Sequence, residues 1–198
     1  MVELRIAQDP EADAVLSRDP FALLTGMLLD QQFPMERAFA GPAKILERFG
    51  SLDPAAIAAA DADEFAALCA TPPAVHRYPG SMATRVQALA AHVVEQYDGR
   101  TARLWEEAES GPALLGRLQA LPGFGKQKSQ IFVALLAKQL GVRPEGWEQV
   151  AGAYAEPGSY RSVADVVDGE SLERVRSFKK QAKQARRAAP HDPSSRPS

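Results

Sequence analysis

Two apolar helical segments in the second half of the chain are joined by a very short turn. Residues 118–121 end the first segment, Pro122-Gly123-Phe124-Gly125 forms the turn, and residues 126–140 form the second segment. The two glycines allow positive φ angles and leave no Cβ in the way of an approaching ligand. The pattern predicts a helical hairpin over about residues 113–140.

Such a turn can serve a ligand or only connect two helices. The second helix would begin beside Lys126, and its unpaired backbone N–H groups and positive dipole end suit a phosphate oxygen. Lys126 and Lys128 add positive charge there, whereas Leu121 and Phe124 would anchor the turn through apolar contacts. On spacing alone, an ordinary αα-hairpin with a Pro-Gly turn is the alternative.

The rest of the chain is also patterned for helices. Asp19-Pro20 supplies an N-cap and a first-turn proline for an apolar helix over Phe21–Leu29. Further helices are predicted over residues 38–49, after Pro54, over 61–68 and over 81–97, and residues 71–80 form a proline-rich loop. No segment alternates with period two for long enough to indicate a sheet. The sequence therefore predicts an all-α protein of eight to ten short helices.

Charge is distributed unevenly along the chain. Residues 174–187 contain seven basic residues and no acidic one, so the rest carries −9 against a total of −2 in 198 residues. This run fits a helix over about residues 171–187 that is either a solvated face or a surface for phosphates. Residues 188–198 are rich in proline and serine and are predicted to form a disordered tail. We expect one domain over residues 1–187.

The composition excludes several classes of protein and site. Cys69 is the only cysteine, which excludes an intramolecular disulfide, a four-cysteine zinc site and an all-cysteine iron–sulfur cluster. No stretch reaches the roughly 20 apolar residues that span a bilayer, and the acidic start lacks the layout of a signal peptide. We therefore expect a cytoplasmic protein with no metal site and no membrane partner.

The turn and the early apolar helix together resemble a known family. Leu-Pro-Gly-Phe-Gly at residues 121–125 resembles the helix-hairpin-helix motif, in which the turn grips the DNA backbone without reading sequence. The segment FALLTGMLLDQQ at residues 21–32 resembles the early helix of the helix-hairpin-helix/Gly-Pro-Asp (HhH-GPD) superfamily of DNA glycosylases. The order of the intervening helices also agrees, so the resemblance covers residues 19–146.

This resemblance implies a two-lobed all-α fold with the active site in the cleft between the lobes. It implies a monomeric DNA N-glycosylase of base excision repair that acts on double-stranded DNA at the nucleoid. The only cofactor it suggests is a monovalent cation at the hairpin. Gln31 and Gln32 would sit at the lesion and help fill the gap in the duplex, whereas without the resemblance they would be a polar helix end.

In the resembled superfamily, a carboxylate supports the sugar cation that forms when the bond to the base breaks. In the endonuclease III and adenine glycosylase branches this carboxylate is an aspartate, 24 residues after the leucine that begins the hairpin motif, and Glu145 occupies that position here. Glu145 is therefore the first catalytic candidate, Glu148 the second, and Asp30, beside the glutamines, the third. Each is otherwise a solvated surface acid.

Other positions define the branch and the expected DNA contacts. Bifunctional members carry a Schiff-base lysine two positions after the last glycine of the turn, and Gln127 stands there, so no lyase activity is predicted. The cysteine count implies the branch without an iron–sulfur cluster. In the loop before residue 80, an aromatic side chain would enter the duplex, unless it only packs. The residues expected to contact DNA are Gln31, Gln32, His76, Arg77, Tyr78, Gly123, Phe124, Gly125, Lys126, Gln127 and Lys128.

Two other functions fit the same residues. A non-catalytic DNA-binding or damage-sensing protein could have kept the scaffold and lost the catalytic aspartate, because Glu145 replaces it. A helical interaction protein with no role on DNA is the third hypothesis, and failure to bind duplex DNA at low salt would favour it.

Overall fold

The computed structural model describes residues 2–188 and contains eleven α-helices, two 3-10 helices and no strand within that range. The α-helices are α1 (Pro10–Arg18), α2 (Pro20–Leu29), α3 (Met35–Phe49), α4 (Pro54–Ala59), α5 (Ala62–Ala70), α6 (Pro79–Tyr97), α7 (Arg103–Glu106), α8 (Gly111–Gln119), α9 (Lys126–Gln139), α10 (Trp147–Ala151) and α11 (Gly169–Ala188). The 3-10 helices are η1 (Gly152–Ala155) and η2 (Val163–Asp165). The predicted tail, apart from Ala188, lies outside the described residues.

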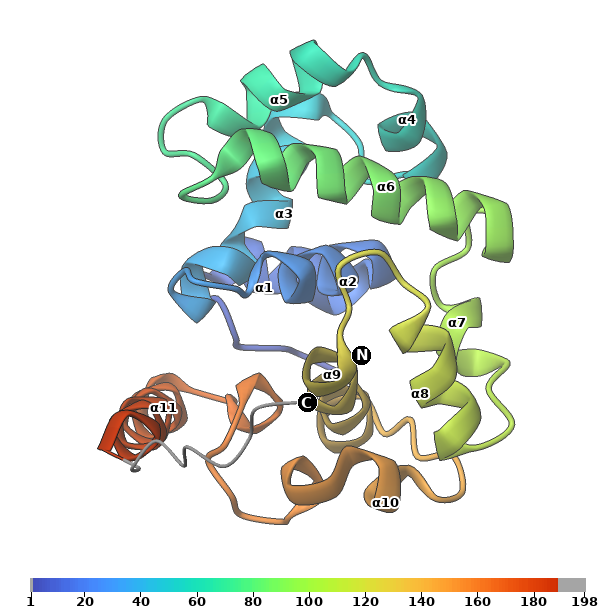
Figure 1. The fold of residues 1–198 in the computed structure, drawn as a ribbon. Coiled ribbons are helices and arrows are strands. Elements are labelled where there is room, and N and C mark those ends of the chain that lie inside the picture. The colour runs from blue at the N-terminus through green and yellow to red at the C-terminus, as the bar shows by residue number, and fades with distance from the viewer. Residues whose placement is uncertain (1, 189–198) are drawn as a thin grey trace, which may run out of the picture.

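The helices form two groups that meet at α2, as the all-α two-lobed prediction requires (Figure 1). In one lobe α6 packs against α4 and α5, while α3 packs against α1, α2 and α5. In the other lobe α9 packs against α8, α10 and both 3-10 helices, and α11 packs against η2. The buried apolar side chains of both lobes form one continuous core, which includes most of α2 and residues 132–136 of α9.

Aspartate followed by proline begins several of these helices. The side chain of Asp19 accepts hydrogen bonds from the backbone N–H groups of Phe21 and Ala22, and Pro20 stands in the first turn of α2. Asp9 and Asp53 cap α1 and α4 in the same way. The start of the apolar helix α2 was therefore predicted correctly from its cap.

The number of α-helices in the described part exceeds the eight to ten predicted from the sequence. Two of the additional helices, α7 and α10, are four and five residues long, which is too short to show a helical period. The third, α1, begins with Asp9-Pro10, the same signal that correctly located α2. The loop over residues 71–80 ends earlier than expected, because Pro79 is the first residue of α6.

The predicted hairpin is formed by α8 and α9, with residues 120–125 as the turn. Gly123 has a φ of +81°, and a Cβ at this position would lie 2.6 Å from Cδ1 of Leu28 in α2. Phe124 is buried and packs edge-on against Phe132, with ring centroids 6.2 Å apart. The turn therefore packs directly against the end of α2.

Cys69, the only cysteine, lies in α5 and is 0% exposed. Burial raises the pKa of its thiol to about 11, so the reactive thiolate is scarce at neutral pH. Across residues 2–188, no helix is long and apolar enough to cross a membrane. Over the same span, no three His, Cys, Asp or Glu side chains gather in a way that could hold a metal ion.

Candidate active site and nucleic-acid interface

The carboxyl end of α2 lies against the beginning of α9. The Lys128 ammonium donates hydrogen bonds to the backbone carbonyl oxygens of Met27 (2.8 Å) and Leu28 (2.9 Å). Carbonyls in the last turn of a helix lack intrahelical partners and carry the negative end of the helix dipole. Lys128 therefore caps α2 from the second lobe and ties the hairpin to the helix that carries the glutamines.

Asp30 is the C-cap residue of α2, directly after its last helical residue, and its side chain is only 11% exposed. Its carboxylate lies 3.8 Å from the ammonium of Lys179 in α11. Burial lowers the pKa of Lys128 to about 8; the charge of Asp30 opposes this shift, and Arg85 and Lys179 add to it. One partly shielded carboxylate and two further cations, from α6 and α11, thus act on Lys128.

The two predicted glutamines differ in their surroundings. The Gln31 amide donates to the carbonyl of Leu28 (3.0 Å), and its Oε1 accepts a hydrogen bond from Arg85 (3.2 Å). Gln32 is exposed and has a φ of +52°, a left-handed conformation that is uncommon outside glycine. Gln31 is therefore held by the protein, whereas the side chain of Gln32 faces solvent.

His76 holds the loop before α6 in place. It is 1% exposed, its Nδ1 accepts from the backbone N–H of Tyr78 (3.1 Å), and its Nε2 lies 2.9 Å from the carbonyl of Gln31. These partners select the neutral tautomer with the proton on Nε2, and burial lowers the pKa of His76 in agreement. The burial contradicts the prediction that the His76 side chain contacts DNA; its role is to join the loop to Gln31.

Tyr78 and Arg77 lie on the outer side of the same loop. Tyr78 is 49% exposed, and the Arg77 guanidinium stacks over its ring at 5.0 Å. A pocket of about 260 Å³ opens beside Tyr78, and it is lined by Gln31, Gln32, His76, Tyr78, Ser81, Met82 and Arg85. Five residues predicted from the sequence, Asp30 included, are thus brought together at the end of α2 and the rim of this pocket.

The turn of the hairpin presents a second surface. Gly125 precedes α9 with no side-chain cap, so the first N–H groups of this 14-residue helix have no side-chain partner at the N-cap. Lys126 and Gln127 are exposed, and Gln127 donates to the hydroxyl of Tyr154 (2.8 Å). Phe124 was predicted to anchor the turn and to contact DNA; because its side chain is buried, it serves the first role.

Comparison with known proteins decides which family this arrangement belongs to. A model of the HhH-GPD superfamily of base excision DNA repair proteins matches residues 25–191, which is most of the chain. The chain is a member of the HhH-GPD superfamily. No curated protein and no solved structure matches it. Members of this superfamily are generally DNA glycosylases, so the chain has a glycosylase-type function on DNA.

Glu145 lies away from the cluster at the end of α2, although the HhH-GPD spacing points to it. Its side chain is exposed, and its backbone carbonyl accepts a hydrogen bond from Gly111 (2.7 Å), the first residue of α8. The start of α8 and the end of α9 form the end of the hairpin opposite the turn, about 20 Å along α9 from Lys128. Glu148, in α10, is also exposed.

Arg85 and Lys179 were not predicted as individual members of the HhH-GPD site. Lys179 belongs to the basic run, which signalled phosphate contact but gave no indication that α11 reaches Asp30. A second contact holds α11 there, because Arg176 forms an ion pair with Glu36 of α3. Arg85 stands on a helix that the sequence predicted, without any signal that distinguishes it from other surface arginines.

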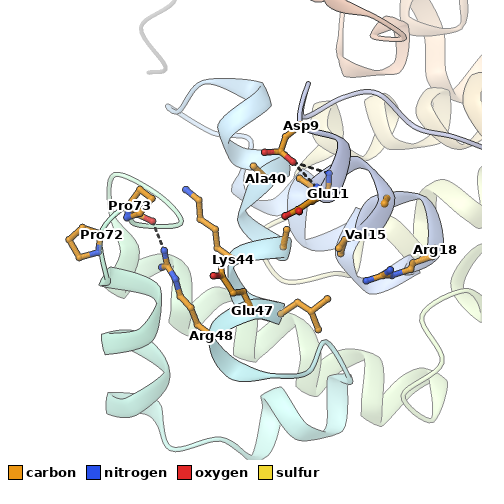
Figure 2. Close-up of a pocket in the computed structure, with 14 residues that line it drawn as sticks. Asp9, Glu11, Val15, Arg18, Ala40, Lys44, Glu47, Arg48, Pro72 and Pro73 are labelled. Atoms are coloured by element: carbon orange, nitrogen blue, oxygen red, sulfur yellow. Dashed lines mark hydrogen bonds between the residues drawn. The ribbon is translucent and has the colours of Figure 1, made fainter.

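A larger pocket of this HhH-GPD protein, about 840 Å³, lies between α1, α3 and the loop at Pro72 and Pro73 (Figure 2). Two of its cations, on α3, bind backbone carbonyls of residues 68–74. Arg48 donates to the carbonyls of Leu68, Thr71 and Pro73, and Lys44 donates to that of Ala74. It shares no lining residue with the pocket at Arg85. Because Arg48 and Lys44 of the larger pocket are engaged in these backbone contacts, we take Asp30 and the pocket at Arg85 as the candidate active site.

Proposed function

We propose that the protein is a monofunctional DNA glycosylase that acts on double-stranded DNA as a monomer, with Asp30 as its catalytic carboxylate. The observation that carries this proposal is the position of Asp30. Among the described residues it is the carboxylate that acts on the hairpin lysine Lys128, and it directly precedes Gln31, which lines the pocket at Arg85. The reaction needs water and no cofactor.

Breaking the bond between a base and deoxyribose leaves positive charge on the sugar. A carboxylate held against the sugar stabilises that charge and accepts a proton from the attacking water. Asp30 suits this role because it is mostly shielded from solvent, which strengthens its interaction with a nearby cation. Lys179 would have to yield its place beside Asp30 to the sugar, and at 3.8 Å the ion pair is loose enough to open.

Two surfaces hold the DNA in this proposal. The open amino terminus of α9 and Lys126 bind phosphate oxygens of one strand, as a helix N-terminus favours an anion. A monovalent cation at the turn can assist this contact. Gln32 and Tyr78, the exposed side chains at the rim of the pocket, enter the duplex and keep the extruded nucleotide out of the stack.

The environments of Gln127 and Lys128 support hydrolysis without strand cleavage. Gln127 is an amide and cannot form a Schiff base, and Lys128 donates two hydrogen bonds to the end of α2. Incubation with substrate DNA and borohydride should therefore trap no covalent adduct. A trapped adduct that is lost in Lys128→Arg would instead identify Lys128 as a nucleophile and the protein as a glycosylase with lyase activity.

The decisive experiment measures base release by Asp30→Asn. Duplex oligonucleotides with deaminated, oxidised, alkylated or mismatched bases are incubated with the protein, and abasic sites are cleaved with alkali. We expect Asp30→Asn to reduce single-turnover excision by about 10²-fold or more, because an amide carries no charge to support the sugar cation. Glu95→Gln, an exposed change on α6, serves as the control.

Two results would contradict the proposal. Loss of activity in Glu145→Gln with full activity in Asp30→Asn would return the catalytic role to Glu145. Absence of abasic product with every oligonucleotide, combined with tight DNA binding, would identify a non-catalytic DNA-binding protein on the same scaffold.

A further inference from the structure

We infer that the base released is uncharged while it is in DNA and leaves as an anion that Arg85 stabilises. The inference rests on the proposed glycosylase function and names the chemical class of its substrate. Deaminated and oxidised bases, which are neutral and rich in carbonyl oxygens, belong to this class. Purines methylated on a ring nitrogen, which are cationic, do not.

The first support is the charge around Asp30. Arg85 and Lys179 both act electrostatically on Lys128, and Arg77, Arg85 and Lys128 act on the neighbouring His76. Asp30 is the carboxylate that opposes them, since Glu36 is paired with Arg176. Positive groups therefore outnumber negative ones at the place where the base must lie, which opposes the entry of a cationic base.

The second support is that protein side chains already cover the aromatic rings near the pocket. A cationic base is held best by the face of an aromatic side chain. Arg77 already covers Tyr78 at 5.0 Å, and Arg37 covers Phe33 at 5.5 Å. The His76 ring also contacts both, with centroid distances of 4.7 Å to Phe33 and 6.0 Å to Tyr78. The aromatic rings beside the pocket are thus engaged by the protein's own cations.

The third support is the electron balance of the reaction. When the C1′–N bond breaks, both bonding electrons leave with the base. A base that is neutral in DNA departs as an anion, whereas a cationic base departs as a neutral molecule. A water oxygen then bonds to C1′ and gives one proton to Asp30. That proton passes from Asp30, directly or through solvent, to the anionic base, which restores the carboxylate, so that atoms and charge balance. Only the neutral substrate creates a negative charge that nearby cations can stabilise.

Arg85 is the cation placed to do this. It lines the pocket, and its guanidinium has five N–H donors, of which one bonds Oε1 of Gln31. The bond to Gln31 fixes the direction of the guanidinium before the substrate arrives. Donors fixed in advance toward a developing negative charge give the largest catalytic effect.

The first experiment compares excision rates in duplexes that differ only in the target base. Uracil, hypoxanthine and an oxidised guanine are set against two N-methylated purines, with the spontaneous loss of each base subtracted. We expect at least one neutral base to be released about tenfold faster than either cationic one. Because cationic purines have the weaker bond, faster release of a cationic base would overturn the inference.

The second experiment substitutes the cation. Arg85→Gln should reduce release of the neutral base by about 10²-fold, the typical cost of removing one donor to a developing anion. Arg85→Lys should recover part of the rate, because it restores charge without the planar fork. Arg100→Gln, an exposed charge change that lies outside the pocket lining, should leave the rate unchanged.

The two experiments separate the inference from the proposed function. If no base is released in any duplex, the glycosylase proposal fails. If bases are released but the cationic ones are preferred, or if Arg85→Gln keeps the full rate on a neutral base, only the inference fails.

Discussion

Lys128 stands one position away from a nucleophilic lysine of related enzymes and has a different role. It stands next to the position where bifunctional relatives carry a nucleophilic lysine, and the sequence assigned it only a phosphate contact. In the structure its ammonium is partly buried and binds the carbonyls that end α2. Its charge is thereby placed near Asp30 and the pocket.

The lowered pKa of Lys128 predicts an alkaline limit to activity. With a pKa of about 8, its ammonium loses a proton as the pH rises through 8, and the positive charge beside Asp30 disappears. We expect excision to fall above pH 8 in the wild-type protein. In Lys128→Arg the fall should be absent, because a guanidinium stays protonated in this range. Single-turnover rates between pH 6 and 10 test this, and identical profiles would contradict it.

Residues at the site differed in how well the sequence could predict them. Asp30, Gln31 and Gln32 are consecutive, so a cluster at the end of an apolar helix could be expected from the chain alone. Glu145 was chosen by spacing within a motif, but spacing does not encode the path of residues 140–147. That path depends on Gly111, where a Cβ would lie 2.5 Å from the carbonyl carbon of Gly146.

Among the elements, α11 joins the basic run to the active site. Ser171, Leu172 and Val175 are buried at its beginning, while the later lysines and arginines are exposed. Truncation at Ser171 would therefore remove core side chains together with the charges. Substitution of the exposed cations isolates the electrostatic effect.

Neutralising α11 should weaken the salt dependence of DNA binding. Each phosphate contact contributes about 0.9 to the slope of log K against log salt concentration. Replacement of Lys180, Lys183, Arg186 and Arg187 by Gln should lower the slope by about one to four. Fluorescence anisotropy with a labelled duplex at several salt concentrations measures it, with Arg100→Gln as control. An unchanged slope would show that these charges only face solvent.

The helices themselves were predictable to different degrees. The long apolar helices α2, α6 and α9 have clear caps or helical periods, and their positions were confirmed. The contact of α11 with the end of α2 was not predictable, because it depends on the path of residues 147–168, whose three helices are short. Local pattern determines a helix, whereas its partner depends on the whole chain.

At the scale of the whole molecule, the two lobes meet where the hairpin turn sits on α2. Gly123 makes this contact possible, since its φ of +81° and the closeness of Leu28 both exclude a side chain. The charge of the chain is near zero only in sum, because the positive groups gather at α9, α11 and the pocket.

Gly123→Ala should disrupt the contact between the hairpin turn and α2 and destabilise the protein. The positive φ costs an L-residue about 1–2 kcal/mol, and overpacking against Leu28 adds about 1–3 kcal/mol. We expect the free energy of unfolding to fall by about 2–5 kcal/mol and DNA affinity to fall with it. Gly116→Ala is the matched control.

Gly116 lies inside α8, and a Cβ added there would meet no atom of another element within 4 Å, so alanine should be neutral or stabilising. Urea unfolding of both variants measures the difference. Equal stability of Gly123→Ala and the wild-type protein would show that the turn does not depend on this close approach.

The burial of Cys69 makes the protein suitable for site-specific labelling. Its thiol is enclosed in α5 and its pKa is about 11, so maleimide reagents should leave the native cysteine intact at neutral pH. A cysteine introduced at an exposed position such as Gln32 would then be the single reactive thiol. A fluorophore there would report the entry of this side chain into a duplex, without any need to remove the natural cysteine.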